Sequence, residues 1–122
     1  MPTSRILIVE DQADIRKLIR LTLTSKHWET FEAATGEEGL EQVRTLRPDL
    51  VLLDVMMPGT LDGFEVCQRL KADPELSATP IVLLTAHGQA TDIERGKQVG
   101  ANGYLTKPFS PLKLIDMVAS ML

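Results

Sequence analysis

The sequence predicts a single α/β domain in which five parallel strands form one doubly wound sheet and five helices cover its two faces. Continuous apolar runs recur along the chain and end abruptly in polar residues, as strands that are buried on both faces do. Segments with the helical period separate these runs, and parallel strands need such crossover connections. The 122 residues have the length of one ordinary domain, and no repeat, linker or low-complexity tract divides them.

The first part of the chain alternates between predicted strands and helices. The apolar run at residues 5–9 is the first strand, and residues 28–33 are a weaker candidate for the second. Between them, one face of a helical repeat carries Ile15, Leu18, Ile19, Thr22 and Leu23. The second helix begins at a capping box, in which Thr35 and Glu38 precede Leu40, Val43 and Leu46.

The same alternation continues to the end of the sequence, with strands predicted at residues 50–53, 80–84 and 103–105. Asp62 and Glu65 form a second capping box before the apolar residues Val66, Cys67 and Leu70. Residues 89–99 have the poorest apolar stripe, so we expect this helix to be the most loosely held. Ser110 and Pro111 open the last helix, whose predicted buried stripe is Ile115, Val118, Ala119 and Leu122.

Composition excludes several classes of function. Thirteen basic and 17 acidic residues give a net charge of -4, which offers no surface for direct binding of nucleic acid or of an anionic membrane. The single cysteine, Cys67, cannot form an internal disulfide, which suits a reducing cytoplasm. The first residues lack the layout of a signal peptide, and no run of apolar residues is long enough to span a membrane.

Polar residues stand where four of the predicted strands end: Glu10 and Asp11, Asp54, Thr85, and Lys107. In a doubly wound sheet, ligands bind beyond the carboxyl ends of the strands. Three carboxylates within a few ångströms repel one another by about 4 kcal/mol per pair at an effective dielectric near 20. The cluster of Glu10, Asp11 and Asp54 therefore predicts a divalent cation, and hard oxygen ligands favour Mg²⁺.

The strings ILIVED, LVLLDVMMPG, IVLLTA and GYLTKPF, in this order and at these intervals, resemble the receiver domains of two-component response regulators. The resemblance extends from Arg5 to the last helix, and it implies a flavodoxin-like sheet with strand order 2-1-3-4-5. It identifies Asp54 as the phosphoacceptor, which receives its phosphoryl group from a histidine kinase or a histidine phosphotransfer protein. It also implies that the backbone carbonyl of Met56 joins the three carboxylates as a ligand of Mg²⁺.

Other positions take their expected roles from the same resemblance. Lys107 would pair with the phosphoryl oxygens, and Thr85 would donate its hydroxyl to one of them as a catalytic and switch residue. Tyr104 matches the aromatic switch residue that fills the space left by Thr85. The Lys107–Pro108 bond resembles a cis peptide of the family. The resulting two-state switch would present residues 89–122 as an output face to a downstream effector, or as a candidate dimer surface after phosphorylation.

Two positions depart from the family pattern. Glu10 stands where aspartate is commoner, and its extra methylene would move the metal contact outward. The loop at residues 58–63 is one residue longer than usual, so its shape and the docking of partners there are open. Of the two histidines, His27 is expected at the surface, and His87 is a candidate neighbour of the phosphate pocket. Cys67, Met56 and Met57 are expected to serve packing.

Two other classes of function compete with this prediction. A phosphatase of the haloacid dehalogenase type also uses a nucleophilic aspartate, but it places a general acid two residues later, where this chain has Met56. An interaction module that is never phosphorylated would not need all five polar residues at the strand ends. We therefore expect a signalling domain that is not an enzyme. The sequence is compatible with a stand-alone receiver and with part of a longer protein, and it specifies neither the kinase nor the output.

Overall fold

The computed structural model describes residues 3–57, 61–85 and 90–122, in which strands and helices alternate strictly along the chain. The ten elements are β1 (Ser4–Val9), α1 (Ala13–Thr22), β2 (Trp28–Ala33), α2 (Gly36–Leu46), β3 (Leu50–Asp54), α3 (Gly63–Ala72), β4 (Ile81–Thr85), α4 (Ala90–Gln98), β5 (Gly103–Thr106) and α5 (Pro111–Met121). All five predicted strands form, including the weaker candidate at residues 28–33.

The strands make one sheet in the order β2-β1-β3-β4-β5, and every neighbouring pair is parallel. This is the order that the resemblance implied. Val9 of β1 lies opposite Leu53 of β3, and Leu53 lies opposite Leu83 of β4. Because the strands are parallel and in this register, their carboxyl ends meet at one edge of the sheet.

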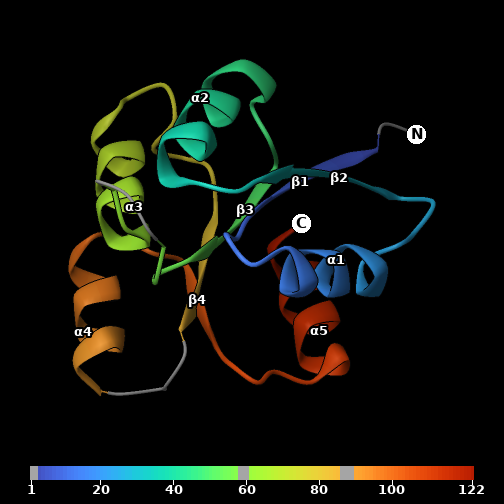
Figure 1. Ribbon diagram of the computed structural model, residues 1–122. Coiled ribbons are helices and arrows are strands. Elements are labelled where there is room, and N and C mark those ends of the chain that lie inside the picture. The colour runs from blue at the N-terminus through green and yellow to red at the C-terminus, as the bar shows by residue number, and fades with distance from the viewer. Residues whose placement is uncertain (1–2, 58–60, 86–89) are drawn as a thin grey trace.

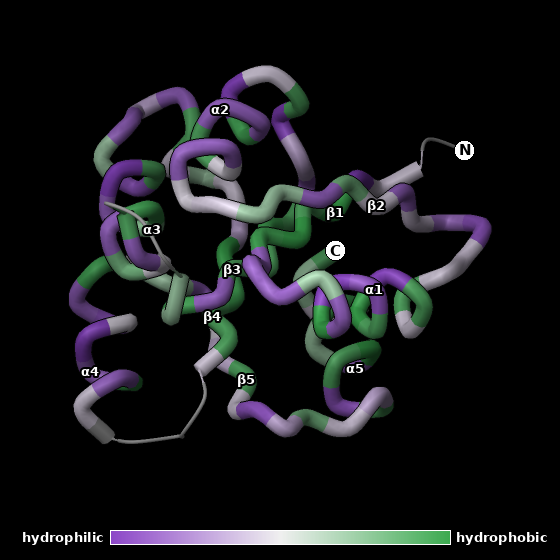
Figure 2. Tube along the Cα trace, in the orientation of Figure 1, coloured by the Kyte–Doolittle hydropathy of each residue, from purple (hydrophilic) through white to green (hydrophobic). Residues whose placement is uncertain are grey.

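Helices cover both faces of the sheet, with α1 and α5 on one side and α2, α3 and α4 on the other (Figure 1). The apolar residues gather along the strands between these layers (Figure 2). Alternate residues of each strand serve opposite faces: Leu7 and Val9 pack with α2 and α3, whereas Ile6 and Ile8 pack with α1 and α5. All four are fully buried, which explains the continuous apolar runs in the sequence.

Three helices begin at the caps that the sequence predicts. The side-chain oxygen of Thr35 accepts from the Glu38 amide at 3.1 Å, and that of Asp62 accepts from the Glu65 amide at 2.9 Å. Ser110 caps α5 in the same way through the Lys113 amide. Each such cap contributes about 1 kcal/mol to stability, so the sequence places these three boundaries well.

The predicted apolar stripe of α5 is wrong by about one residue around the helix. Leu114 and Val118 are fully buried, and Met117 and Met121 pack beside them, whereas Ala119 and Leu122 are exposed. The helix meets the sheet through the row Leu114–Val118, and Ala119 lies well around the helix from that row. Ile115 is partly buried at the edge of the contact.

A smaller correction concerns α1. Ile19 and Leu23 are fully buried, but Leu18, which was expected on the same face, is 55% exposed. Ile15, Ile19 and Leu23 follow one another at intervals of four, so they define the line of contact with the sheet, and Leu18 lies to one side of it.

The described residues of α4 include no buried large side chain, and Ile93 and Val99 are only partly buried. This agrees with the poor stripe, while the loose attachment of α4 stays a prediction. Across the ranges that the structure describes, no helix is both long enough and apolar enough to cross a membrane.

Candidate functional site

The carboxyl edge of the sheet brings together the polar residues that follow the strands. Glu10 follows β1, Asp54 ends β3 and Thr85 ends β4, and these strands are direct neighbours in the sheet. The exposed fractions of the three residues are 0%, 3% and 0%. Polar side chains this deeply buried require a structural or chemical reason, because burying them without partners costs free energy.

Glu10, Asp11 and Asp54 form a carboxylate cluster, in which one oxygen from each lies within 4.8 Å of the others. Burial raises the pKa of Glu10, and the neighbouring Asp54 raises it further. Burial and the proximity of Glu10 also raise the pKa of Asp11. A divalent cation relieves such repulsion, and three carboxylates are ligands that Mg²⁺ prefers. The chemistry of this donor set therefore fits Mg²⁺.

Met56 lies beside this cluster through its backbone. Its amide donates to Oδ1 of Asp54 at 3.3 Å, and the residue is 70% exposed. The main chain of Met56 is therefore what contacts Asp54, and the residue also lines the pocket beside Asp11.

Lys107 reaches the cluster from the end of β5. Its Nζ atom lies 2.5 Å from Oε1 of Glu10 and 3.3 Å from Oδ1 of Asp54. Burial lowers the pKa of Lys107, but the hydrogen bond to Glu10 and the charge of Asp54 outweigh this effect, so the pKa rises overall. The Lys107 amide donates to the Thr85 carbonyl at 2.6 Å, and the Lys107–Pro108 bond is cis, as expected.

The hydroxyl of Thr85 is buried and has no hydrogen-bond partner among the described residues. Most buried hydroxyls in proteins do have one. Thr85 ends β4, the strand next to β3, so this unpartnered hydroxyl belongs to a residue at the same edge of the sheet as Asp54.

Gly63 lets α3 begin directly against the end of β3. A Cβ atom at this position would overlap the carbonyl oxygen of Asp54, which excludes any other residue without a shift of the backbone.

Beside Asp11 is a pocket of about 460 Å³, whose lining includes Asp62 and Arg95. The Arg95 guanidinium lies 4.4 Å from the centre of the Phe64 ring and 3.8 Å from Asp62, so it joins α4 to the start of α3.

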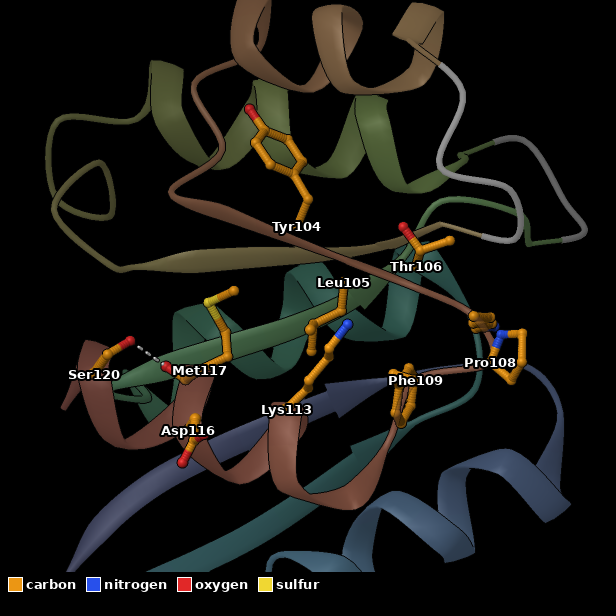
Figure 3. A pocket seen from close by; sticks show the side chains of 10 residues that line it. Tyr104, Leu105, Thr106, Pro108, Phe109, Lys113, Asp116, Met117 and Ser120 are labelled. Carbon is orange, nitrogen blue, oxygen red and sulfur yellow. Dashed lines mark hydrogen bonds between the residues drawn. The ribbon is translucent and has the colours of Figure 1, made fainter.

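Tyr104 and Leu105 leave β5 on opposite sides of the sheet (Figure 3). The Tyr104 ring lies on the α4 side, where a Cβ atom at Gly96 would come within 2.5 Å of it. Burial raises the pKa of its hydroxyl. On the other side, Leu105 and Met117 line a pocket of about 660 Å³ between β5 and α5.

One residue at the site was missed from the sequence. The guanidinium of Arg16 donates to the carbonyl oxygen of Glu10 at 2.8 Å and to the carboxylate of Glu32 at 3.0 Å. An arginine in the first turn of a helix matches no motif, so only its spacing of six residues from Glu10 was available as a signal.

Three further residues with expected roles lie in the described part of the chain. His27 is exposed, as expected, and Cys67 is buried, where burial raises its pKa to about 11. Met57 packs against the core on the α2–α3 side. His87 and residues 58–60 of the longer loop lie outside the described residues.

The chain is similar to known proteins over nearly its whole length. A family model described as "Response regulator receiver domain" matches residues 6–119. The transcriptional regulatory protein ResD of Bacillus subtilis is 40% identical over 119 residues, which are 98% of this chain and 48% of ResD. The DNA-binding response regulator MtrA of Mycobacterium tuberculosis is 42% identical over 118 residues, 97% of this chain and 50% of MtrA. The chain therefore spans about half the length of these curated relatives.

Solved structures also resemble it over nearly the whole of this chain. The chemotaxis protein CheY4 of Vibrio cholerae has a TM-score of 0.91 and 33% sequence identity, and the match covers 98% of this chain and 99% of that one. The receiver domain of the Francisella response regulator 1452 has a TM-score of 0.88 and 29% identity, with 98% and 96% covered.

Proposed function

The chain belongs to the response regulator receiver domain family of two-component signalling, and from this premise we propose that Asp54 is the residue that accepts the phosphoryl group. One observation carries the proposal: the Asp54 carboxylate sits in a buried acidic cluster with the Lys107 ammonium 3.3 Å away. The cluster suits a cation, and the lysine suits the oxygens of a phosphoryl group.

In the proposed reaction, an oxygen of the Asp54 carboxylate attacks the phosphorus of a phosphohistidine or of a small acyl phosphate. The bond from phosphorus to the donor nitrogen or oxygen breaks, and its electron pair leaves with the donor. The Lys107 ammonium group, which donates to Glu10 and pairs with Asp54 in this structure, would move toward the phosphoryl oxygens. Bound Mg²⁺ would neutralise charge on those oxygens, and Glu10, Asp11, Asp54 and the Met56 carbonyl are the groups that would hold it.

Thr85 and Tyr104 are the proposed switch residues. The buried hydroxyl of Thr85 would donate to a phosphoryl oxygen, which gives the phosphorylated state a contact that the other state lacks. Tyr104 lies on the α4 side of β5, next to Gly96, where it would respond to movement of the end of β4. The surface formed by α4, β5 and α5 would then change as the output face.

The residue two positions after Asp54 disfavours a phosphatase. The position two residues after Asp54 holds Met56, whose side chain has no acid and is exposed, so it supplies no general acid for turnover of an external ester. We therefore place this domain among signalling modules rather than enzymes. An interaction module that is never phosphorylated is also disfavoured, because such a module has no use for a buried carboxylate cluster.

We extend the proposal to the setting of the domain. Residues 1–122 would act as one receiver domain in the cytoplasm, with a histidine kinase or histidine phosphotransfer protein as donor. ResD is named as a transcriptional regulatory protein and MtrA as a DNA-binding response regulator. A net charge of -4 does not favour DNA binding by residues 1–122. We therefore expect any such output from residues outside this range or from another protein. Dimerisation through α4, β5 and α5 after phosphorylation belongs to the same proposal.

The intact mass of the protein after incubation with acetyl phosphate and Mg²⁺ tests the assignment of Asp54. The native chain should gain one phosphoryl group, and chelation of Mg²⁺ should abolish the gain. Asp54→Asn should gain none, whereas the matched control Asp62→Asn, which keeps a capping side chain for α3, should react like the native chain. An adduct that persists in Asp54→Asn would refute the assignment.

A further inference from the structure

The carbonyl between the two acidic residues after β1 is held by a side chain from α1. The Nη1 atom of Arg16 donates to the carbonyl oxygen of Glu10 at 2.8 Å. This carbonyl belongs to the peptide that joins Glu10 to Asp11, so its orientation sets the directions in which both carboxylates leave the main chain. The Arg16 side chain is only 21% exposed, which makes this a sheltered contact.

Arg16 is itself fixed by Glu32 of β2. Its Nε atom donates to Oε1 of Glu32 at 3.0 Å, and Arg20 donates to Oε2 of the same carboxylate at 3.0 Å. The main-chain oxygen of Glu32 accepts from the side-chain amide of Gln42 at 2.8 Å. Glu32 is therefore anchored from α1 and from α2, and it holds Arg16 in one orientation.

The contact between Arg16 and the Glu10 carbonyl lies just beyond the last paired residues of the sheet. The last paired residues of β1 and β2 are Val9 and Ala33, and the Glu10 amide donates to the Ala33 carbonyl at 3.0 Å. The bond from Arg16 then fixes the carbonyl of the same residue. With both its amide and its carbonyl held, Glu10 has little freedom to rotate, and Asp11 begins from a fixed peptide.

We propose that Arg16, held by Glu32, is a positioning residue for the cation site, because it presets the Glu10–Asp11 peptide so that both carboxylates converge with Asp54. The inference rests on the proposed function, in which this cluster binds Mg²⁺. Outer-shell residues of this kind typically change metal affinity by about 10-fold to 100-fold when they are removed.

The sign of the effect separates this role from two simpler ones. Arg16 carries a positive charge close to the cluster, so by charge alone its removal should make Mg²⁺ bind more tightly. A contact that only stabilises the fold should lower the free energy of unfolding and leave the affinity of the folded protein unchanged. A positioning role predicts weaker binding, against the electrostatic trend.

The test is the dissociation constant of Mg²⁺, measured by isothermal titration calorimetry on the full chain at a temperature where every variant is folded. Arg16→Met should weaken binding about tenfold. Arg16→Lys, which keeps the charge but lacks the guanidinium fork, should fall between it and the native chain. Glu32→Gln should weaken binding less than Arg16→Met does.

The matched control is Arg20→Met, which removes a cation from the same carboxylate and leaves the bond from Arg16 to the Glu10 carbonyl. Its dissociation constant for Mg²⁺ should stay within about twofold of the native value.

Equal or tighter binding by Arg16→Met would overturn the inference while leaving the proposed function intact. Equal losses in Arg16→Met and Arg20→Met would also overturn it, since they would indicate that only the charge of Glu32 matters. If Arg16→Met does not fold, Arg16→Lys decides the question, because it keeps the positive charge, and unchanged binding by this variant would overturn the inference. A native chain that binds no Mg²⁺ would instead refute the proposed function, and the inference with it.

Discussion

The Nζ atom of Lys107 lies 2.5 Å from Oε1 of Glu10, although β3 and β4 separate their strands in the sheet. The lysine therefore spans the carboxyl edge of the sheet and also comes within 3.3 Å of Asp54. Two buried carboxylates share one ammonium group. The stability of the folded state therefore depends on this lysine, or on another cation that neutralises the two carboxylates.

Replacement of Lys107 by methionine should destabilise the protein strongly only in the absence of Mg²⁺. Removing one partner of a buried ion pair costs about 3 kcal/mol, because the remaining charge stays buried without compensation. Saturating Mg²⁺ should restore much of this loss by neutralising Glu10 and Asp54. Urea unfolding in EDTA and in Mg²⁺ measures both quantities.

The control for this experiment is Lys113→Met, on the exposed side of α5, which should change the free energy of unfolding by less than about 0.5 kcal/mol. If Lys107→Met loses the same stability in EDTA and in Mg²⁺, the charge of the Lys107 ammonium is not what compensates the carboxylate cluster.

Without a divalent cation, the carboxylate cluster should make the protein less stable as the pH rises. The pKa values of Glu10 and Asp11 in the folded chain lie above their ordinary values of 4.5 and 3.8, first because of burial. A raised folded pKa means that the folded state favours the protonated acid. Its stabilising contribution is therefore complete below the ordinary pKa and is lost as the pH rises through the folded pKa.

Other groups titrate in the same range, so the comparison is with the double variant Glu10→Gln/Asp11→Asn. In EDTA, the free energy of unfolding of the native chain should fall relative to this variant as the pH rises above about 4, where these acids begin to ionise in the unfolded chain. In Mg²⁺ the trend should reverse, because only the ionised native carboxylates bind the cation. A difference that stays constant with pH in EDTA would contradict the raised pKa values.

Thr85→Val should leave the unphosphorylated protein as stable as the native chain, or more stable by about 1 kcal/mol. The hydroxyl of Thr85 is buried without a partner among the described residues, and replacing such a group by a methyl removes its desolvation cost. Thr85→Ser, which keeps the hydroxyl and loses a buried methyl, should instead cost about 1 kcal/mol. Urea unfolding of both variants without acetyl phosphate checks the order, and the reverse order would mean that the hydroxyl is satisfied.

The sequence predicts the strand ends well because parallel strands that are buried on both faces have little freedom in composition. The residues directly before Glu10, Asp54 and Thr85 are apolar and fully buried, so the first polar residue after each run marks the edge of the sheet. The resemblance to receivers adds the strand order, which apolar patterning alone leaves open.

Side-chain contacts between distant segments are less accessible to such reasoning. The buried stripe of α5 depends on how the helix is rotated against the sheet, and Leu114 rather than Ala119 occupies the contact. The bond from Arg16 to the Glu10 carbonyl depends on Glu32, which β2 brings beside α1. No local pattern encodes either arrangement.

Gly96→Ala tests how Tyr104 is accommodated beneath α4. Alanine favours a helix by about 1 kcal/mol over glycine, so the substitution should stabilise α4 if space allowed it. However, the new Cβ atom would lie 2.5 Å from Cε1 of Tyr104 and 3.0 Å from Cδ1 of Leu83. We expect a net loss of about 1 kcal/mol in the free energy of unfolding, together with a displaced Tyr104 ring.

The same substitution should change sign when the ring is removed. In a Tyr104→Ala background the nearest remaining contact of the Cβ atom added by Gly96→Ala is the end of the Leu83 side chain, so the substitution should gain about 0.5 to 1 kcal/mol from helix propensity. A double-mutant cycle by urea unfolding then gives a coupling energy of about 2 kcal/mol between positions 96 and 104. Additive effects would mean that the ring already avoids Gly96, and that α4 does not restrain the proposed switch residue. A large coupling would mean that glycine at position 96 is what lets Tyr104 occupy the α4 side of β5.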